Sequence, residues 1–148
     1  MAQKYRLLLV DDELSIRKVI GERLKSKGFD VILAENGEEG LSKAQQETPD
    51  LIILDIMLPK INGYEICTIL KREPAFKRIP IVMFTAKGQQ KEHLAGMMCG
   101  ADAYISKSCE FDVLLEQILV LLANQSPPAQ AAEGPTGSTT PNADTSSA

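Results

Sequence analysis

Five short apolar stretches, separated by segments with helical periodicity, constrain the fold of this chain more than any other feature. We predict strands at Arg6–Val10, Asp30–Ala34, Leu51–Leu54, Ile81–Phe84 and Ala103–Ile105. The first, third and fourth contain continuous apolar runs, which are typical of parallel strands covered on both faces. Strands that alternate strictly with helices form right-handed βαβ units. The sequence therefore predicts an α/β fold, a doubly wound (βα)5 sandwich with a parallel sheet between two layers of helices.

The predicted helices differ in the strength of their periodicity and end signals. The clearest, Phe111–Leu122, has apolar residues at spacings of three and four, so one of its faces must be buried. A first helix carries Ile16–Leu24, and Gly28 suits the left-handed residue that ends many helices. A second begins at Asn36, an N-cap residue, with Glu39 placed to complete a capping box. Two weaker helices are expected at Tyr64–Arg72 and Gln90–Met98.

Composition limits the class of protein and the kinds of partner. With 148 residues, 44% hydrophobic and 24% charged, the chain has room for one soluble globular domain. A formal net charge of -4 without a basic stripe argues against nucleic-acid binding. No apolar run approaches the roughly 18 residues of a membrane span and no signal peptide is visible, so we expect no membrane contact and a cytoplasmic location. One histidine and three widely spaced cysteines favour neither a catalytic triad nor a disulfide framework.

The composition changes abruptly near the C-terminus. Residues 126–148 are rich in Ser, Thr, Pro, Ala and Gly and contain no large apolar side chain. Such a segment cannot bury enough surface to offset the entropy lost on ordering. We therefore expect one domain over residues 5–125, a disordered tail over residues 126–148, and no output domain in the chain.

Acidic, hydroxyl and basic side chains stand at the ends of four predicted strands: Asp11 with Asp12, Asp55, Thr85, and Lys107. In an open parallel sheet, functional groups gather beyond the carboxyl ends of the strands. A single Asp after a strand can equally be an ordinary turn or cap residue. Three clustered carboxylates, however, are electrostatically costly unless a cation lies between them. Oxygen ligands imply a hard cation, and Mg²⁺ fits because it usually takes one or two direct carboxylates and binds alongside phosphate oxygens.

Four motifs at these strand ends resemble those of the response-regulator receiver family. They are Asp11-Asp12, the segment from Asp55 to Gly63, Thr85-Ala86, and the segment from Tyr104 to Lys107, and the resemblance extends over residues 5–125. Any one motif is weak, whereas the four in this order are highly specific. The resemblance implies the strand order 2-1-3-4-5 of the single-domain chemotaxis regulators. Pro59 and Gly63 fit the loop after Asp55, Pro59 by presetting a turn and Gly63 by allowing a positive φ.

The same resemblance implies a chemical role for each site residue. Asp55 would be the nucleophile that accepts a phosphoryl group from a sensor histidine kinase or a phosphotransfer protein. Lys107 and Thr85 would contact the phosphoryl oxygens. The ligands implied for Mg²⁺ are Asp12, Asp55 and the backbone carbonyl of Met57, with Asp11 acting through water. Beyond its own phosphorylation and dephosphorylation such a domain catalyses no reaction, so we do not expect an enzyme.

The resemblance also implies a conformational switch. Thr85 would move toward the new phosphate, and Tyr104 would turn inward to fill the space; alternatively, Tyr104 is simply a half-buried aromatic residue of the fifth strand. The face made by the fourth helix, fifth strand and fifth helix would then contact a downstream target protein or a second copy, giving a monomer or a phosphorylation-linked homodimer. At Ser108 the chain departs from the family, where proline after a cis bond is usual, and a cis or a trans bond after Lys107 remains open.

Two other functions remain open at the level of sequence. A haloacid-dehalogenase-type phosphatase also uses an Asp nucleophile with Mg²⁺. Its nucleophile follows the first strand and has a second Asp two residues on, whereas Asp11 is followed by Asp12 and Glu13. The second alternative is a scaffold that acts without phosphorylation, which the complete set of acceptor residues disfavours.

Overall fold

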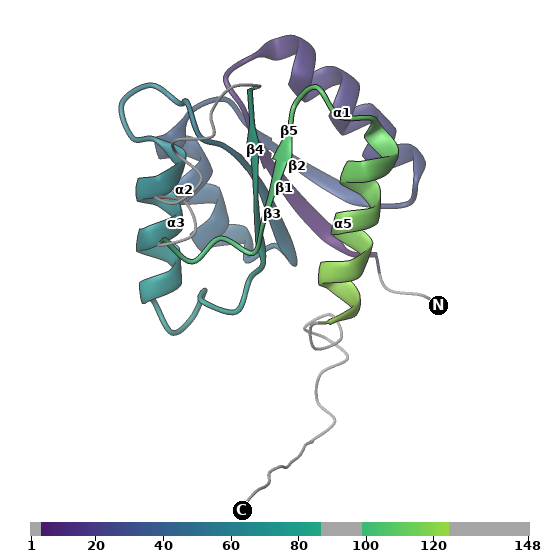
Figure 1. The fold of residues 1–148 in the computed structure, drawn as a ribbon. Coiled ribbons are helices and arrows are strands. Elements are labelled where there is room, and N and C mark those ends of the chain that lie inside the picture. Colours follow the sequence, from purple (N-terminus) through teal and green to yellow (C-terminus); the bar gives the residue numbers. More distant parts are fainter. Residues whose placement is uncertain (1–3, 87–98, 125–148) are drawn as a thin grey trace, which may run out of the picture.

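A computed structural model describes residues 4–86 and 99–124, and its centre is one parallel sheet of five strands (Figure 1). The strands are β1 (Arg6–Val10), β2 (Asp30–Ala34), β3 (Leu51–Asp55), β4 (Ile81–Thr85) and β5 (Ala103–Ser106). Their order is β2-β1-β3-β4-β5, and every neighbouring pair is parallel. The predicted sheet and its strand order are confirmed.

Helices cover both faces of the sheet. The described helices are α1 (Leu14–Ser26), α2 (Gly37–Glu47), α3 (Gly63–Arg72) and α5 (Phe111–Ala123). Figure 1 shows α1 and α5 on one face and α2 and α3 on the other, as a doubly wound fold requires. None of the helices in the described part of the chain is long and apolar enough to span a membrane. The helix expected at Gln90–Met98 and the tail expected at residues 126–148 lie outside the described residues.

The sheet divides the hydrophobic core into two layers. One layer, under α2 and α3, includes Val10, Leu54, Ile66, Cys67 and Leu70. The other, under α1 and α5, includes Leu9, Leu24, Phe84, Leu114 and Ile118. All five residues of β3 and of β4 are buried, because these strands lie inside the sheet and are covered on both faces. The central strands therefore hold the ends of β1, β3 and β4 in fixed positions.

The helix ends follow the predicted signals in part. Gly28 follows the C-cap of α1 with φ +97°, as predicted. Asn36 caps α2 by accepting the N–H of Glu39, but the Glu39 carboxylate accepts the N–H of Glu35, one residue before the position that a capping box requires. The complete capping box belongs to α3, where Asn62 and Glu65 each accept the other's backbone N–H. This box seats the first turn of α3 directly after the loop that follows β3.

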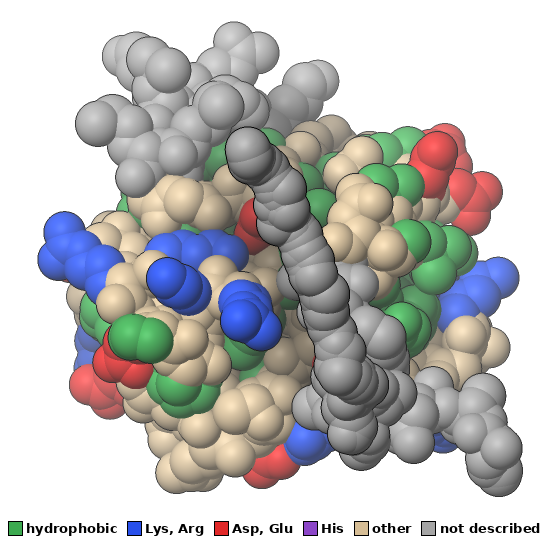
Figure 2. Space-filling model, turned by 90° about the horizontal axis from the view of Figure 1, so that it is seen from below, with side chains coloured by type: hydrophobic (Ala, Val, Ile, Leu, Met, Phe, Trp, Pro, Cys, Tyr) green, Lys and Arg blue, Asp and Glu red, His purple; other side chains and the backbone are tan. Residues whose placement is uncertain are grey.

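At the edge where the strands begin, charged side chains connect α3 with the loop before β4 and with the start of β4. Lys71, in the last turn of α3, donates to the carbonyls of Lys77 and Ile79 and to the carboxylate of Asp102. Asp102 also accepts the N–H of Ile81, the first residue of β4, at 2.8 Å. Figure 2 shows the molecule from this side, with Lys and Arg side chains gathered in the left part of the view. The acidic residues of the predicted site lie at the opposite edge.

Candidate functional site

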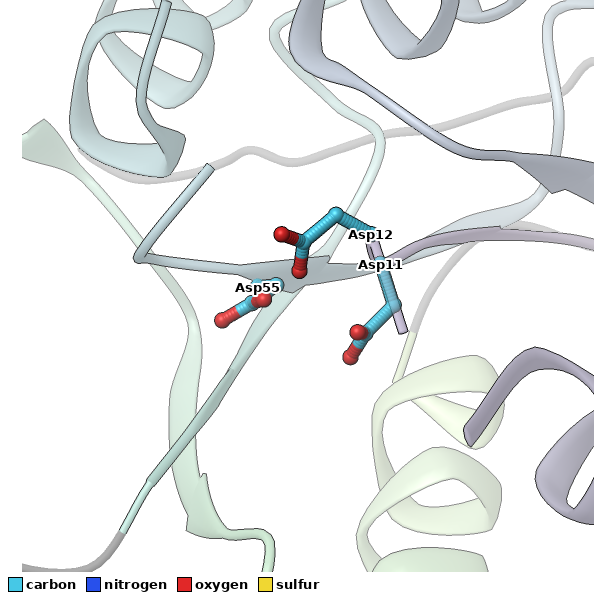
Figure 3. Close-up of side chains that lie close together, drawn as sticks. All are labelled: Asp11, Asp12 and Asp55. Carbon is cyan, nitrogen blue, oxygen red and sulfur yellow. The ribbon is translucent and has the colours of Figure 1, made fainter. Parts of the chain in front are cut away.

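Three carboxylates converge at the edge where the strands end. Asp11 and Asp12 directly follow β1, and Asp55 is the last residue of β3. Because β1 and β3 are neighbours and Val10 pairs with Leu54, the structure brings these carboxylates together. One oxygen from each lies within 4.8 Å of the others (Figure 3). Asp11 and Asp55 are buried, whereas Asp12 is exposed.

Lys107 brings a positive charge into this group of acids. Its Nζ lies 3.0 Å from Oδ2 of Asp11 and 3.2 Å from Oδ2 of Asp55. A third acid, Glu13, lies 3.3 Å from the same nitrogen. Glu13 is not among the predicted site residues, although its position directly after Asp11 and Asp12 in the sequence was the signal for it. The ammonium is thus surrounded by more negative charge than it can balance.

The loop that carries Lys107 reaches this position without a cis bond. The described residues contain no cis peptide bond, so Lys107 and Ser108 are joined in trans. The backbone N–H of Lys107 donates to the carbonyl of Thr85 at 2.7 Å. The Ser106 hydroxyl accepts the N–H of Ser108 at 3.1 Å and lies 2.8 Å from the Ser108 hydroxyl. Hydrogen bonds across this short turn therefore orient the lysine.

Burial and mutual repulsion shift the protonation of the site. Burial, and then the charge of Asp11, raises the pKa of Asp55 to about 6, although Lys107 opposes the shift. Burial also raises the pKa of Asp11. Burial disfavours the charged form of Lys107, but its contacts with Asp11 and Asp55 together raise the pKa of the ammonium. The lysine therefore stays charged, while each buried acid is held in its ionised form at a cost.

The loop after β3 holds Asp55 through backbone contacts. The N–H of Met57 donates to Oδ1 of Asp55 at 3.2 Å, and the Met57 side chain is 57% exposed. The prediction that Gly63 supplies a positive φ is wrong, since in this loop the positive φ (69°) belongs to Lys60. Gly63 is required for another reason: a Cβ there would lie 2.5 Å from the backbone oxygen of Asp55. The first residue of α3 thus packs directly on the backbone of Asp55.

Thr85 and Tyr104 lie on the same face of the sheet. Thr85 ends β4 and pairs with Ser106, two residues beyond Tyr104 in β5, so the two side chains are diagonal neighbours. The Thr85 hydroxyl donates to the carbonyl of Ala86 at 3.4 Å. Tyr104 is half-buried with its hydroxyl oxygen inside the protein, where burial and then its interaction with Tyr64 of α3 raise its pKa. Tyr104 is therefore turned toward α3.

The acidic group has the chemistry of a site for a hard divalent cation. Its donors are all carboxylate oxygens, and three of them surround one point beside a single ammonium. The buried Oδ2 of Asp11 accepts no well-aligned hydrogen bond from the described residues, although Lys107 lies 3.0 Å away. An excess of buried negative charge of this kind is neutralised by a bound cation. The residues present therefore fit Mg²⁺.

Comparisons with known proteins agree with this geometry. The family model of the response regulator receiver domain matches residues 7–119. "Probable transcriptional regulator ycf27" of Cyanophora paradoxa is 40% identical over 137 residues, covering 93% of this chain and 53% of that protein. The alkaline phosphatase synthesis transcriptional regulatory protein PhoP of Bacillus subtilis is 45% identical over 102 residues, covering 69% and 42%. The chain thus spans about half the length, or less, of these curated relatives.

A solved structure shares the fold over almost its whole length. It is a CheY-like response regulator receiver domain protein from Methanospirillum hungatei. It superposes with a TM-score of 0.78 at 30% identity, covering 83% of this chain and 97% of that protein.

Proposed function

Because the chain belongs to the response regulator receiver domain family, we propose that Asp55 accepts a phosphoryl group and that the domain signals through its phosphorylation state. The observation that carries the proposal is the position of the Asp55 carboxylate, 3.2 Å from the Lys107 ammonium and next to Asp11 and Asp12. This is the arrangement that phosphoryl transfer needs, since the reaction depends on positioning and charge neutralisation. Family membership favours this function over the phosphatase alternative.

In the proposed reaction, a carboxylate oxygen of Asp55 attacks the phosphorus of a phosphohistidine. The new O–P bond forms as the P–N bond breaks, and the histidine nitrogen leaves with the electron pair and takes up a proton. With a pKa of about 6, Asp55 is mainly ionised at neutral pH and can act as the nucleophile. Lys107 stabilises negative charge on the phosphoryl oxygens. Mg²⁺, held by Asp12, Asp55 and the Met57 carbonyl and by Asp11 through water, would supply further neutralisation of that charge.

The proposed switch links Thr85 to Tyr104. A phosphoryl group on Asp55 adds about 1.5 to 2 negative charges and new hydrogen-bond acceptors. The Thr85 hydroxyl, which donates only at 3.4 Å to Ala86, can turn to the phosphoryl oxygen with little loss. Movement of Thr85 changes the space next to Tyr104 on the same face of the sheet. The phosphorylation state would thereby alter the surface around Tyr104 of β5.

Exposed apolar side chains support contacts with partner proteins at two places. Leu14 and Met57, 61% and 57% exposed, flank the acidic site, where a histidine kinase or phosphotransfer protein must approach. Val113, Leu119 and Val120 are exposed on α5. They support the proposal that α5, together with β5, contacts a downstream target or a second copy. The fourth helix of that proposed face lies outside the described residues.

Phosphate incorporation tests the proposal. The purified chain is incubated with Mg²⁺ and a small phosphodonor such as phosphoramidate, and intact mass is measured. We expect the wild type to gain one phosphoryl group and Asp55→Asn to gain none. Asp30→Asn, an exposed Asp at the opposite edge, is the matched control and should be phosphorylated like the wild type.

Three outcomes would contradict the proposal. Undiminished incorporation in Asp55→Asn would show that another residue is the acceptor. A wild type that takes up no phosphoryl group would point to the scaffold alternative. Turnover of a generic phosphate ester without a stable phosphoprotein would point to the phosphatase.

A further inference from the structure

The three cysteines are divided between the two faces of the sheet. Cys67, in α3, is fully buried, and Cys99, shortly before β5, is partly exposed. Both belong to the layer under α2 and α3. Cys109 packs in the other layer, under α1 and α5. The sheet therefore separates Cys109 from the other two thiols.

Cys67 and Cys99 contact each other although 32 positions separate them in the sequence. The Sγ of Cys67 donates to the carbonyl oxygen of Cys99 at 3.4 Å. Burial, and then a hydrogen bond and an electrostatic interaction with the Cys99 side chain, raise the pKa of the Cys67 thiol. The two side chains are thus neighbours, which is the first geometric requirement for a disulfide.

We propose that Cys67 and Cys99 form a reversible intramolecular disulfide when the chain meets a low-molecular-weight disulfide such as oxidised glutathione. The Cys99 thiolate, the more accessible of the two, attacks one glutathione sulfur, and the other glutathione leaves as a thiolate. The Cys67 thiolate then attacks the Cys99 sulfur of this mixed disulfide and releases the second glutathione. The two protons lost by the cysteines end on the two glutathione thiolates, and two electrons pass from the protein to the oxidant.

The position of the bridge gives it a consequence for the domain. It would join α3 covalently to the segment that leads into β5. Tyr104 of β5 lies in the same cluster, because its pKa is raised by burial, by Tyr64 and then by both cysteines. The bridge would therefore restrain the surroundings of Tyr104, and it does not require phosphorylation of Asp55. Since a buried thiol is rarely ionised, the second step is slow and the bridge responds to sustained oxidation.

Peptide mapping under defined redox conditions tests this proposal. The full chain is equilibrated with mixtures of reduced and oxidised glutathione, quenched in acid, alkylated and digested without reduction. We expect a peptide pair linked through Cys67 and Cys99 whose yield rises with the oxidised fraction and is lost on adding dithiothreitol. Cys109 should remain available for alkylation. The Cys109→Ser variant should form the same bridge, and Cys99→Ser should not.

The unfolded chain provides a reference for the contribution of the fold. In denaturant, loop closure favours Cys99 with Cys109, the pair closest in sequence. If the native chain instead forms the Cys67–Cys99 disulfide, that preference must come from the contact between these two residues in the folded structure. Equal yields of all pairings in the native chain, or only mixed disulfides with glutathione at every ratio, would overturn the proposal. Because the wild-type map is decisive by itself, the test does not depend on the folding of either variant.

Discussion

The two edges of the sheet use charged residues in opposite ways. Where the strands begin, acids meet matching donors: Asp50 accepts the backbone N–H of Arg6, and Asp102 accepts the Lys71 ammonium and the backbone N–H of Ile81. Where the strands end, three carboxylates gather beside one ammonium. The first edge is electrostatically matched, and the second carries an excess of negative charge.

The difference shows how one sheet separates stability from function. At the first edge, these carboxylates bind the first residues of β1 and β4, so they raise the free energy of unfolding. At the other edge, burial raises the pKa of Asp11 and of Asp55, which means that their ionised forms destabilise the fold. That cost is the counterpart of a site that a bound cation would stabilise.

The largest expected effect comes from removing charge at the edge where the strands end. Because the pKa of Asp55 rises from 3.8 to about 6 on folding, ionisation of Asp55 opposes folding. The penalty is absent below pH 3.8, grows as the pH rises toward 6, and is complete above it. Without divalent cations near pH 7.5, Asp55→Asn should therefore raise the free energy of unfolding by about 3 kcal/mol. Urea denaturation with a chelator present measures the change.

The pH dependence and added Mg²⁺ serve as controls for that prediction. The gain in Asp55→Asn should shrink to about half near pH 5, where folded Asp55 is already mostly protonated. Added Mg²⁺ should stabilise the wild type more than the variant, because the variant lacks one of the three clustered carboxylates. If Asp55→Asn is less stable than the wild type at neutral pH in chelator, the charge of Asp55 does not destabilise the fold, and the proposed contrast between the two edges is wrong.

An intermediate effect is expected at the edge where the strands begin. Asp102→Ala leaves the Ile81 N–H and the Lys71 ammonium without their shared carboxylate, so we expect the free energy of unfolding to fall by about 2 kcal/mol. Glu22→Ala, an exposed change on α1, should stay within about 0.5 kcal/mol of the wild type. Phosphate incorporation by folded Asp102→Ala should match the wild type. Slower incorporation would mean that the edges are coupled.

The smallest effect concerns the turn that orients Lys107. Ser106→Ala removes the hydroxyl that accepts the N–H of Ser108, and these groups are exposed, so stability should fall by only about 0.5 kcal/mol. Phosphorylation should slow a few-fold, because the lysine is held less firmly. Ser106→Thr keeps a hydroxyl and should restore the rate, which stopped-flow or quenched-flow phosphorylation measures. Equal phosphorylation rates in the wild type, Ser106→Ala and Ser106→Thr would show that the ion pairs of Lys107 position it without help from the turn.

The sheet could be predicted from sequence because its strands are short apolar runs with clear breaks between them. β3, β4 and β5 each extend one residue past the predicted run, onto Asp55, Thr85 and Ser106. These polar residues stay in the ladder, where Asp55 pairs with Phe84 and Thr85 with Ser106. Backbone pairing, rather than side-chain polarity, decides where a strand ends.

The composition of the site was also accessible from sequence, whereas its detailed contacts were not. Parallel topology alone requires that Asp11, Asp12 and Asp55 meet, since they follow neighbouring strands. The contact of Glu13 with Lys107 and the turn at Ser106 depend on loop paths and side-chain rotamers, which tertiary contacts determine.

Gly63 ties the orientation of α3 to the residue that we propose as phosphoryl acceptor. Its N–H donates to the carbonyl of Ile56, and no side chain separates it from the Asp55 backbone. The distance between α3 and the end of β3 is therefore set by direct contact between their main chains. Unlike a side chain, the main chain cannot adapt to a shift by changing rotamer. A displacement of the acceptor backbone would be passed to α3 as a whole, and Tyr64 and Cys67 would move with it.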